Sequence, residues 1–139
     1  SSVLSILREY PTDGSYAYWW PREVSWKGTT RDLFWAGARV AEGDPERRSY
    51  CSGITWEVWI RAVQSREGGE AAVRAAIPDA AAMEAFRRLW FGVAGNRDTL
   101  ALALGEYGLG TPVTSWDDAQ PGDLLQLKRC GGLLTVCRR

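Results

Sequence analysis

The residues best suited to covalent chemistry in this 139-residue chain form the run Tyr50-Cys51-Ser52-Gly53. A dense apolar stretch follows, and its composition predicts a largely buried helix over residues 52–66. A thiol in the first turn of that helix would face unpaired backbone N–H groups and the positive end of the helix dipole, and both favour the thiolate. Cys51 is therefore a candidate nucleophile, with the backbone N–H of Cys51 or Ser52 as the candidate oxyanion donor.

The neighbours of Cys51 complete this predicted site. Gly53 leaves room for a substrate backbone to come close, and Tyr50 is assigned with it to substrate binding. A second interpretation treats Cys51 as a structural residue that begins a core helix, because free cysteine is among the most buried residue types. The two interpretations differ in whether the sulfur is exposed or lies among aliphatic neighbours.

The chain contains no histidine, which limits the chemistry it can complete by itself. A Ser-His or Cys-His pair cannot form within it, and neither can a His-based zinc or non-haem iron site. The three cysteines, Cys51, Cys130 and Cys137, are an odd number without a Cys-x-x-Cys pair. We therefore expect at least one free thiol, no metal site and no cofactor. Cys130 and Cys137 would form a disulfide only if the glycines between them turned back tightly.

A second motif lies late in the chain, in the run Gln120-Pro121-Gly122-Asp123-Leu124-Leu125-Gln126-Leu127. Together with the Cys-Ser-Gly tripeptide that opens an apolar helix, this run resembles the NlpC-type cell-wall peptidases and their CHAP-amidase relatives. The resemblance covers about residues 29 to 136. In that family the nucleophile lies in an Asp-Cys-Ser-Gly-like box, and a Pro-Gly-Asp turn leads into the first core strand.

The resemblance implies a papain-like α+β fold, in which the helix that begins at Cys51 packs on a small antiparallel sheet. It also implies hydrolysis or transfer at an amide bond, with a peptide or cell-wall fragment, such as a peptidoglycan peptide, as substrate. Residues 51–53 match the family's box and residues 121–123 match its turn. Gln126 lies on the strand after the turn and is assigned to the substrate site, with a solvent-facing position as the alternative.

The chain departs from the family pattern in three places. Tyr50 stands where the family has Asp, about seventy residues separate the box from the turn, and Leu133 stands where the Gly-His pair of the next strand supplies the base. Leucine cannot accept a proton, and general acid–base help contributes about 10²- to 10⁴-fold in rate. We therefore expect the chain to be inactive as written. Only two strands fit after Pro121, so the C-terminal strands are expected to be incomplete, in a truncated or frameshifted product or in a genuine pseudoenzyme.

A second group of residues suited to ligand binding is the aromatic segment Tyr16-Ala17-Tyr18-Trp19-Trp20-Pro21. Aromatic rings combine a large apolar area with a polar edge and stack on sugar faces, so Trp19 and Trp20 are assigned to substrate binding. The alternative is a cluster of rings that packs inward and covers the helices. The eight tryptophans of the chain support a second function class, a noncatalytic Trp-rich binding or interaction module.

Charge and hydropathy exclude other partners. Seventeen Lys and Arg against seventeen Asp and Glu give a formal net charge of zero, which removes the attraction that nonspecific nucleic-acid binding needs. No apolar run approaches the roughly 18 residues of a membrane helix, and the first residues lack the pattern of a secretory signal. We expect no nucleic-acid partner, no membrane span, and a bacterial location that is cytoplasmic or exported after trimming.

The elements that must position these residues are mostly helices. Besides the helix at Cys51, helices are expected over residues 3–9, from Thr29 or Thr30 to Gly43, from Pro78 through Trp90, and from Asn96 to Tyr107. An ordered aromatic loop is expected over residues 11–28. After Pro112, a capped turn at residues 115–119 precedes two strands that begin at Leu124 and Leu133. The chain as a whole, residues 1–139, is expected to be one domain.

Overall fold

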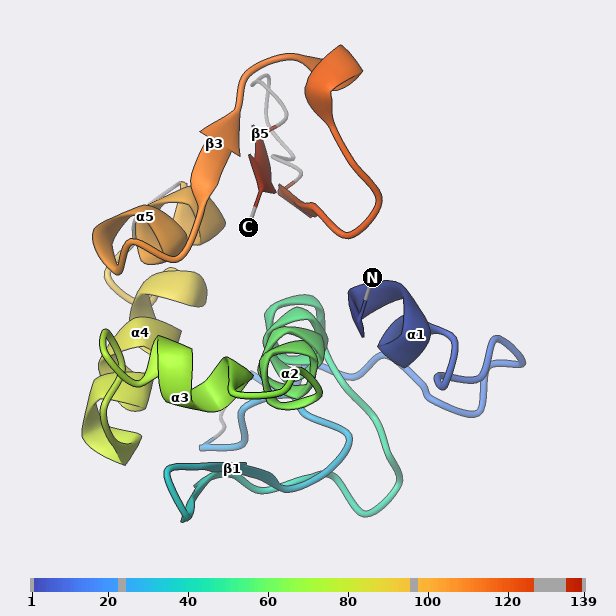
Figure 1. The fold of residues 1–139 in the computed structure, drawn as a ribbon. Helices are drawn as coiled ribbons and strands as arrows, with labels where there is room; N and C mark the ends of the chain where they lie inside the picture. Colours follow the sequence, from blue (N-terminus) through green and yellow to red (C-terminus); the bar gives the residue numbers. More distant parts are fainter. Residues whose placement is uncertain (1, 23–24, 96–97, 127–134, 139) are drawn as a thin grey trace. The chain divides into compact units, whose positions relative to one another are not determined.

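A computed structural model gives the fold of the chain and describes every residue except 1, 23–24, 96–97, 127–134 and 139 (Figure 1). The chain divides into two compact units, Ser2–Glu84 and Ala85–Arg139. Helices and short antiparallel strands occur together, which confirms the α+β class. The papain-like identity and the single domain stay predictions. Within the described ranges, no helix is long and apolar enough to cross a membrane.

The first unit is organised by helix α2 (Cys51–Gln64), which confirms the helix predicted after Tyr50. Most of its side chains are buried, as the dense apolar pattern indicates. Helix α1 (Ser2–Leu7) lies beside α2 in Figure 1 and ends shortly before Pro11, close to its predicted end. The residues that join the two helices are Val3 and Ile6 on α1 and Val58 and Ala62 on α2, with Tyr10 packed against them.

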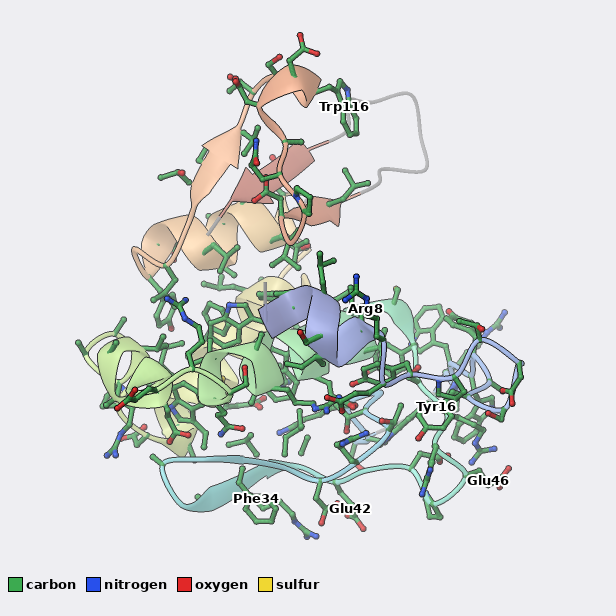
Figure 2. The ribbon with its side chains drawn as sticks, turned by 45° about the vertical axis from the view of Figure 1, so that its right-hand side comes forward. Arg8, Tyr16, Phe34, Glu42, Glu46 and Trp116 are labelled. Atoms are coloured by element: carbon green, nitrogen blue, oxygen red, sulfur yellow. The ribbon has the colours of Figure 1, made fainter. Side chains whose placement is uncertain are left out.

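The segment predicted as a helix after Thr30 is a β-hairpin. Strand β1 (Leu33–Trp35) pairs antiparallel with β2 (Ala38–Ala41), and the turn residues Ala36 and Gly37 have φ values of 49° and 78°. Two consecutive positive φ values are typical of the type I′ turn, whose twist matches that of the flanking strands. The helical spacing misled the prediction because a period of two fits the same segment: Leu33 and Trp35 are buried, whereas Phe34 points outward (Figure 2).

The core of the first unit contains several fully buried indoles. Trp35 of β1 stacks on Trp59 of α2 with ring centroids 6.3 Å apart, and its indole N–H donates to the carbonyl of Ile77 at 2.8 Å. The short helix α3 (Gly69–Val73) follows α2. This packing attaches the hairpin and residue 77 to the helix that carries Cys51.

Helix α4 (Ala80–Trp90) confirms the helix predicted after Pro78 and runs from the first unit into the second. The carboxylate of Asp79 accepts a hydrogen bond from the Ala82 N–H at 2.9 Å, which satisfies one of the free donors of the first turn. In the second unit, Phe86 packs edge-on against Tyr107 with centroids 5.1 Å apart.

The second unit contains helix α5 (Thr99–Glu106) and a three-stranded antiparallel sheet in the order β3-β5-β4. The strands are β3 (Thr111–Val113), β4 (Leu124–Gln126) and β5 (Thr135–Arg138). Strands β4 and β5 confirm the two predicted strands, whereas β3 was not predicted because it contains Pro112. It is an edge strand, where proline is tolerated.

The turn predicted at residues 115–119 is a 3-10 helix, Trp116–Asp118. The Ser115 hydroxyl accepts a hydrogen bond from the Asp117 N–H at 3.3 Å, which confirms the predicted cap. Three residues of other predictions, the cap Asn96 and the strand positions Leu127 and Leu133, lie outside the described residues.

Candidate functional site

Cys51 is the first residue of α2, and its side chain is exposed. Tyr50 before it is extended, with φ −129° and ψ 165°, and provides no side-chain cap. The carbonyl of Cys51 accepts a hydrogen bond from the Thr55 hydroxyl at 2.9 Å. The structure therefore places the sulfur at the helix start and in solvent, and the interpretation of Cys51 as a buried core residue is wrong.

No acid–base group is bonded to this thiol in the part of the chain that the structure describes. The sequence contains no histidine to fill that role. Ser52 is half-buried, and its carbonyl accepts from the Thr55 hydroxyl at 3.2 Å. The site thus has an accessible sulfur at a helix start, and none of the described residues provides it with a positioned base.

Gly53 is buried against the chain's own backbone. A Cβ at this position would lie 2.2 Å from the carbonyl oxygen of Gly28 and 2.4 Å from that of Lys27. Gly28 itself has φ 71°, and a Cβ there would lie 2.4 Å from the ring of Tyr50. Glycine is required at both positions because the segment of residues 27–28 crosses the start of α2 in close contact. The space beside Gly53 is occupied by this segment.

Three rings form an array that ends at the residue before Cys51. Tyr50 packs edge-on against Trp26 with centroids 5.4 Å apart, and Trp26 lies 5.4 Å from Trp19 at an interplanar angle of 33°. The guanidinium of Arg48 lies 3.9 Å above the ring of Trp19, within the range of a cation–π interaction. We call Trp19, Trp26 and Tyr50 the aromatic array.

The two tryptophans assigned to the binding site lie in different surroundings. Residues 17–19 run alongside Ser49, whose carbonyl accepts from the Trp19 N–H at 2.9 Å and whose N–H donates to the carbonyl of Ala17 at 3.1 Å. Trp19 packs against Trp26 and is 39% exposed, whereas Trp20 is 63% exposed. The described residues of the aromatic segment form a loop, as predicted, and the structure brings Trp19 and Tyr50 into one array through Trp26 but leaves Trp20 outside it.

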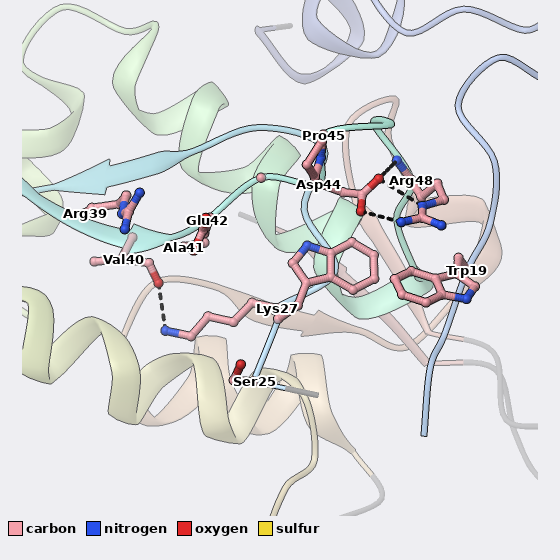
Figure 3. Close-up of a pocket in the computed structure, with 12 residues that line it drawn as sticks. Trp19, Ser25, Lys27, Arg39, Val40, Ala41, Glu42, Asp44, Pro45 and Arg48 are labelled. Carbon is pink, nitrogen blue, oxygen red and sulfur yellow. Dashed lines mark hydrogen bonds and ion pairs between the residues drawn. The ribbon is translucent and has the colours of Figure 1, made fainter. Parts of the chain in front are cut away.

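An open cleft of about 580 Å³ lies beside the aromatic array (Figure 3). Its walls come from the hairpin strand β2, the turn that follows it, and the segments before and after Trp26. The lining residues include Trp19, Trp26, Lys27, Arg39, Glu42 and Arg48. Sequence reasoning identified Trp19 but missed the cleft, because its walls meet only when the hairpin folds back onto residues 25–27.

Asp44 and Arg48 form the tightest ion pair of the cleft. The Nε of Arg48 donates to Oδ2 at 3.0 Å and its Nη2 donates to Oδ1 at 2.9 Å, a two-point contact drawn in Figure 3. The carboxylate also accepts the backbone N–H groups of Glu46 and Arg48. The hydrogen bond from the Arg48 side chain holds the pKa of Asp44 below its usual value.

The other cations of the cleft are also paired. Lys27 donates to the carbonyl of Val40 at 2.7 Å and lies 3.0 Å from a carboxylate oxygen of Glu84. Arg39 lies 3.5 Å from the carboxylate of Asp32. The cationic side chains of the lining are therefore compensated by acids of the same unit.

Gln126, which was assigned to the substrate site, lies in the second unit on β4. Its side-chain oxygen accepts a hydrogen bond from the Leu100 N–H at 3.1 Å, near the start of α5. This contact satisfies a free donor in the first turn of a helix. The structure therefore gives Gln126 a capping contact with α5. Both predicted positions, in the substrate site and facing solvent, differ from this contact.

A buried carboxylate that sequence reasoning missed joins three segments of the first unit. Glu57 has no exposed surface. It accepts hydrogen bonds from the Tyr10 hydroxyl at 2.6 Å and from the Thr30 N–H and hydroxyl at 2.7 and 2.8 Å, and Arg31 lies 3.3 Å away. Burial and the neighbouring Glu57 raise the pKa of Tyr10. The available signal was an acid in the middle of the apolar run Trp56-Glu57-Val58.

No family model, curated protein or solved structure matches this chain. Within the described residues, no group of three or more Cys, Asp and Glu side chains is placed to hold a metal ion.

Proposed function

We propose that this chain is a noncatalytic binding module whose ligand contacts the cleft at the aromatic array. The observation that carries the proposal is the position of Trp19. Its ring contacts both the Arg48 guanidinium and Trp26 at the wall of an open cleft, and part of it remains exposed. A rigidly held ring supplies a large contact area with little loss of conformational entropy when a ligand binds.

The lack of a base beside Cys51 among the residues that the structure describes favours binding over catalysis. An exposed thiol without a proton acceptor lacks the activation on which a cysteine nucleophile depends, and the leaving amine lacks a proton donor. The cleft needs no such group to bind a ligand. Its volume of about 580 Å³ falls within the range of small-molecule sites.

The test is a tryptophan-fluorescence titration with soluble peptidoglycan fragments that contain both glycan and peptide. We expect a saturable change for the unmodified chain and at least tenfold weaker binding for Trp19→Ala, which corresponds to about 1.4 kcal/mol. Trp19→Phe keeps a ring and is expected to retain part of the affinity. Trp116→Ala is the matched control, because Trp116 is exposed and does not line the cleft.

Two outcomes would contradict the binding module. One is the absence of any saturable change with the folded chain. The other is equal affinity for Trp19→Ala and Trp116→Ala, since the signal would then come from a surface other than the cleft.

The second candidate function is a papain-like, NlpC-type cysteine hydrolase that acts on amide bonds. The specific observation in its favour is the exposed sulfur of Cys51 at the first residue of α2, directly after Tyr50 of the aromatic array. In this candidate the thiolate attacks the carbonyl carbon and a backbone N–H at the helix start binds the oxyanion.

Thiol labelling tests this candidate. With iodoacetamide at pH 6 to 7, a nucleophile at Cys51 is expected to react much faster than Cys130 and Cys137. Equal slow labelling of the three would count against it. In the binding module, Cys51→Ala leaves the fluorescence titration unchanged, so the two functions give different results.

A further inference from the structure

We propose that the ligand of the cleft is a neutral saccharide. This inference rests on the proposed binding function and adds the chemical class of the ligand. It follows from the charges, the ring faces and the free hydrogen-bonding groups of the cleft.

The pairing of charges in the cleft leaves little attraction for an anion. The cations Lys27, Arg39 and Arg48 are matched by Glu84, Asp32 and Asp44 within the same unit. Glu42 also lines the cleft and is exposed, and it has no ion-pair partner in the described part of the chain. Each of these cations therefore has an acid beside it, and an anionic ligand would have to compete with a carboxylate for it.

The ring of Trp19 is unsuited to a cationic ligand. One face of this indole already carries the Arg48 guanidinium at 3.9 Å. A second cation on the same indole would be repelled by this guanidinium, which offsets the gain from a further cation–π contact. Trp19 remains 39% exposed, and the apolar carbons of its ring can pack against the C–H groups of a sugar.

Free hydrogen-bonding groups of both kinds line the same cleft as this ring. The pairs with Asp44 and Glu46 use Nε and Nη2 of Arg48, and among the described residues its Nη1 has no hydrogen-bond partner. The carboxylate of Glu42 is an acceptor. Hydroxyl and acetamido groups both donate and accept hydrogen bonds, so a neutral sugar can use both residues without bringing a charge into the cleft.

The experiment compares three tetrasaccharide probes by calorimetry on the full chain. They are the neutral N-acetylglucosamine tetramer, the cationic glucosamine tetramer and the anionic galacturonic acid tetramer. We expect the neutral probe to bind tightest, with a Kd that changes less than twofold between 50 and 500 mM NaCl, because no charges are neutralised on binding. Trp19→Ala is expected to weaken it at least tenfold, with Trp116→Ala unchanged and Trp19→Phe intermediate.

The outcomes separate this inference from the function on which it rests. Tighter binding of either charged probe, or a more than tenfold loss of affinity in 500 mM NaCl, would overturn the neutral saccharide. If peptidoglycan fragments bind through Trp19 while none of the tetrasaccharides does, the saccharide is overturned and the binding module stands. If neither the fragments nor the tetrasaccharides bind, both proposals fail.

Discussion

Glu57 is the residue on which the packing of the first unit depends most directly. A carboxylate without exposed surface is costly to bury unless donors replace its water. Here the hydroxyls of Tyr10 and Thr30, a backbone N–H and the Arg31 guanidinium surround it. The carboxylate thus links α2 to the segment after α1 and to the residues that enter the hairpin.

Glu57→Gln is expected to destabilise the protein strongly. The amide has one acceptor oxygen, so its NH₂ group would face donors that a carboxylate accepts, and Arg31 would lose its counter-charge. We expect a loss of about 3–5 kcal/mol in the free energy of unfolding, measured by urea denaturation. Glu67→Gln is the matched control at an exposed position and is expected to change stability by at most about 0.5 kcal/mol. If Glu57→Gln has the same free energy of unfolding as the unmodified chain, the buried hydrogen bonds of Glu57 do not stabilise the fold.

The Asp44–Arg48 pair predicts a dependence of stability on pH. Because the pKa of Asp44 is lowered in the folded state by Arg48, its contribution is complete above the unfolded value of about 3.9 and is lost as the pH falls through the folded value. Asp44→Asn is therefore expected to have a lower urea midpoint than the unmodified chain at pH 7. The difference between the two urea midpoints should become smaller as the pH falls from 5 to 2. A difference that stays constant over this range would show that the charge of Asp44 does not stabilise the fold.

At the scale of the element, the crossing of residues 27–28 over the start of α2 explains the glycine at position 53. Gly53→Ala would place a Cβ against two carbonyl oxygens, so we expect a destabilisation of more than about 2 kcal/mol from overpacking. Gly105 is the matched helical glycine, since a Cβ there meets nothing within 4 Å. Gly105→Ala is expected to raise stability by about 0.5–1 kcal/mol. Thermal unfolding followed by circular dichroism measures the stability of both variants. If Gly53→Ala unfolds at the same temperature as the unmodified chain, residues 27–28 do not pack tightly against position 53.

The hairpin turn carries backbone strain at Ala36, a non-glycine residue with φ 49°. Left-handed backbone costs an L-residue about 1–2 kcal/mol, and glycine avoids that cost. Ala36→Gly is therefore expected to raise the Tm by a few degrees. Ala38→Gly, in strand β2, serves as the control and is expected to lower it. If Ala36→Gly lowers the Tm as much as Ala38→Gly does, the turn stores no strain at Ala36.

The elements differ in how well the sequence predicted them, for a physical reason. Helix α2 was predicted to within two residues at each end because its apolar pattern is long and dense, and α4 because Asp79 caps it. The hairpin was missed because the nine residues 33–41 fit a period of two and a period of 3.6 almost equally well. Burial of Leu33 and Trp35 on one face decides between them, and burial depends on α2.

Positive and negative charges balance over the whole sequence and also within the cleft, where the cations form ion pairs. The chain has a formal net charge of zero, and the cations of the cleft each face an acid. The sequence therefore predicted that electrostatic attraction would not select the partner. It did not identify the pairs, because Lys27 and Glu84 are far apart along the chain.

The sequence by itself determined that an apolar helix begins at Cys51 and that no imidazole is available to activate this thiol. These properties are local or compositional. Only the tertiary structure decided which rings face the cleft, why Gly53 is a glycine, and where Glu57 finds its donors. Each of these depends on residues that meet across long stretches of chain, as Tyr10 and Glu57 do at a separation of 47 residues. Helix and strand preferences depend on residues within one or two turns, so they carry no information about contacts between residues that are distant in the sequence.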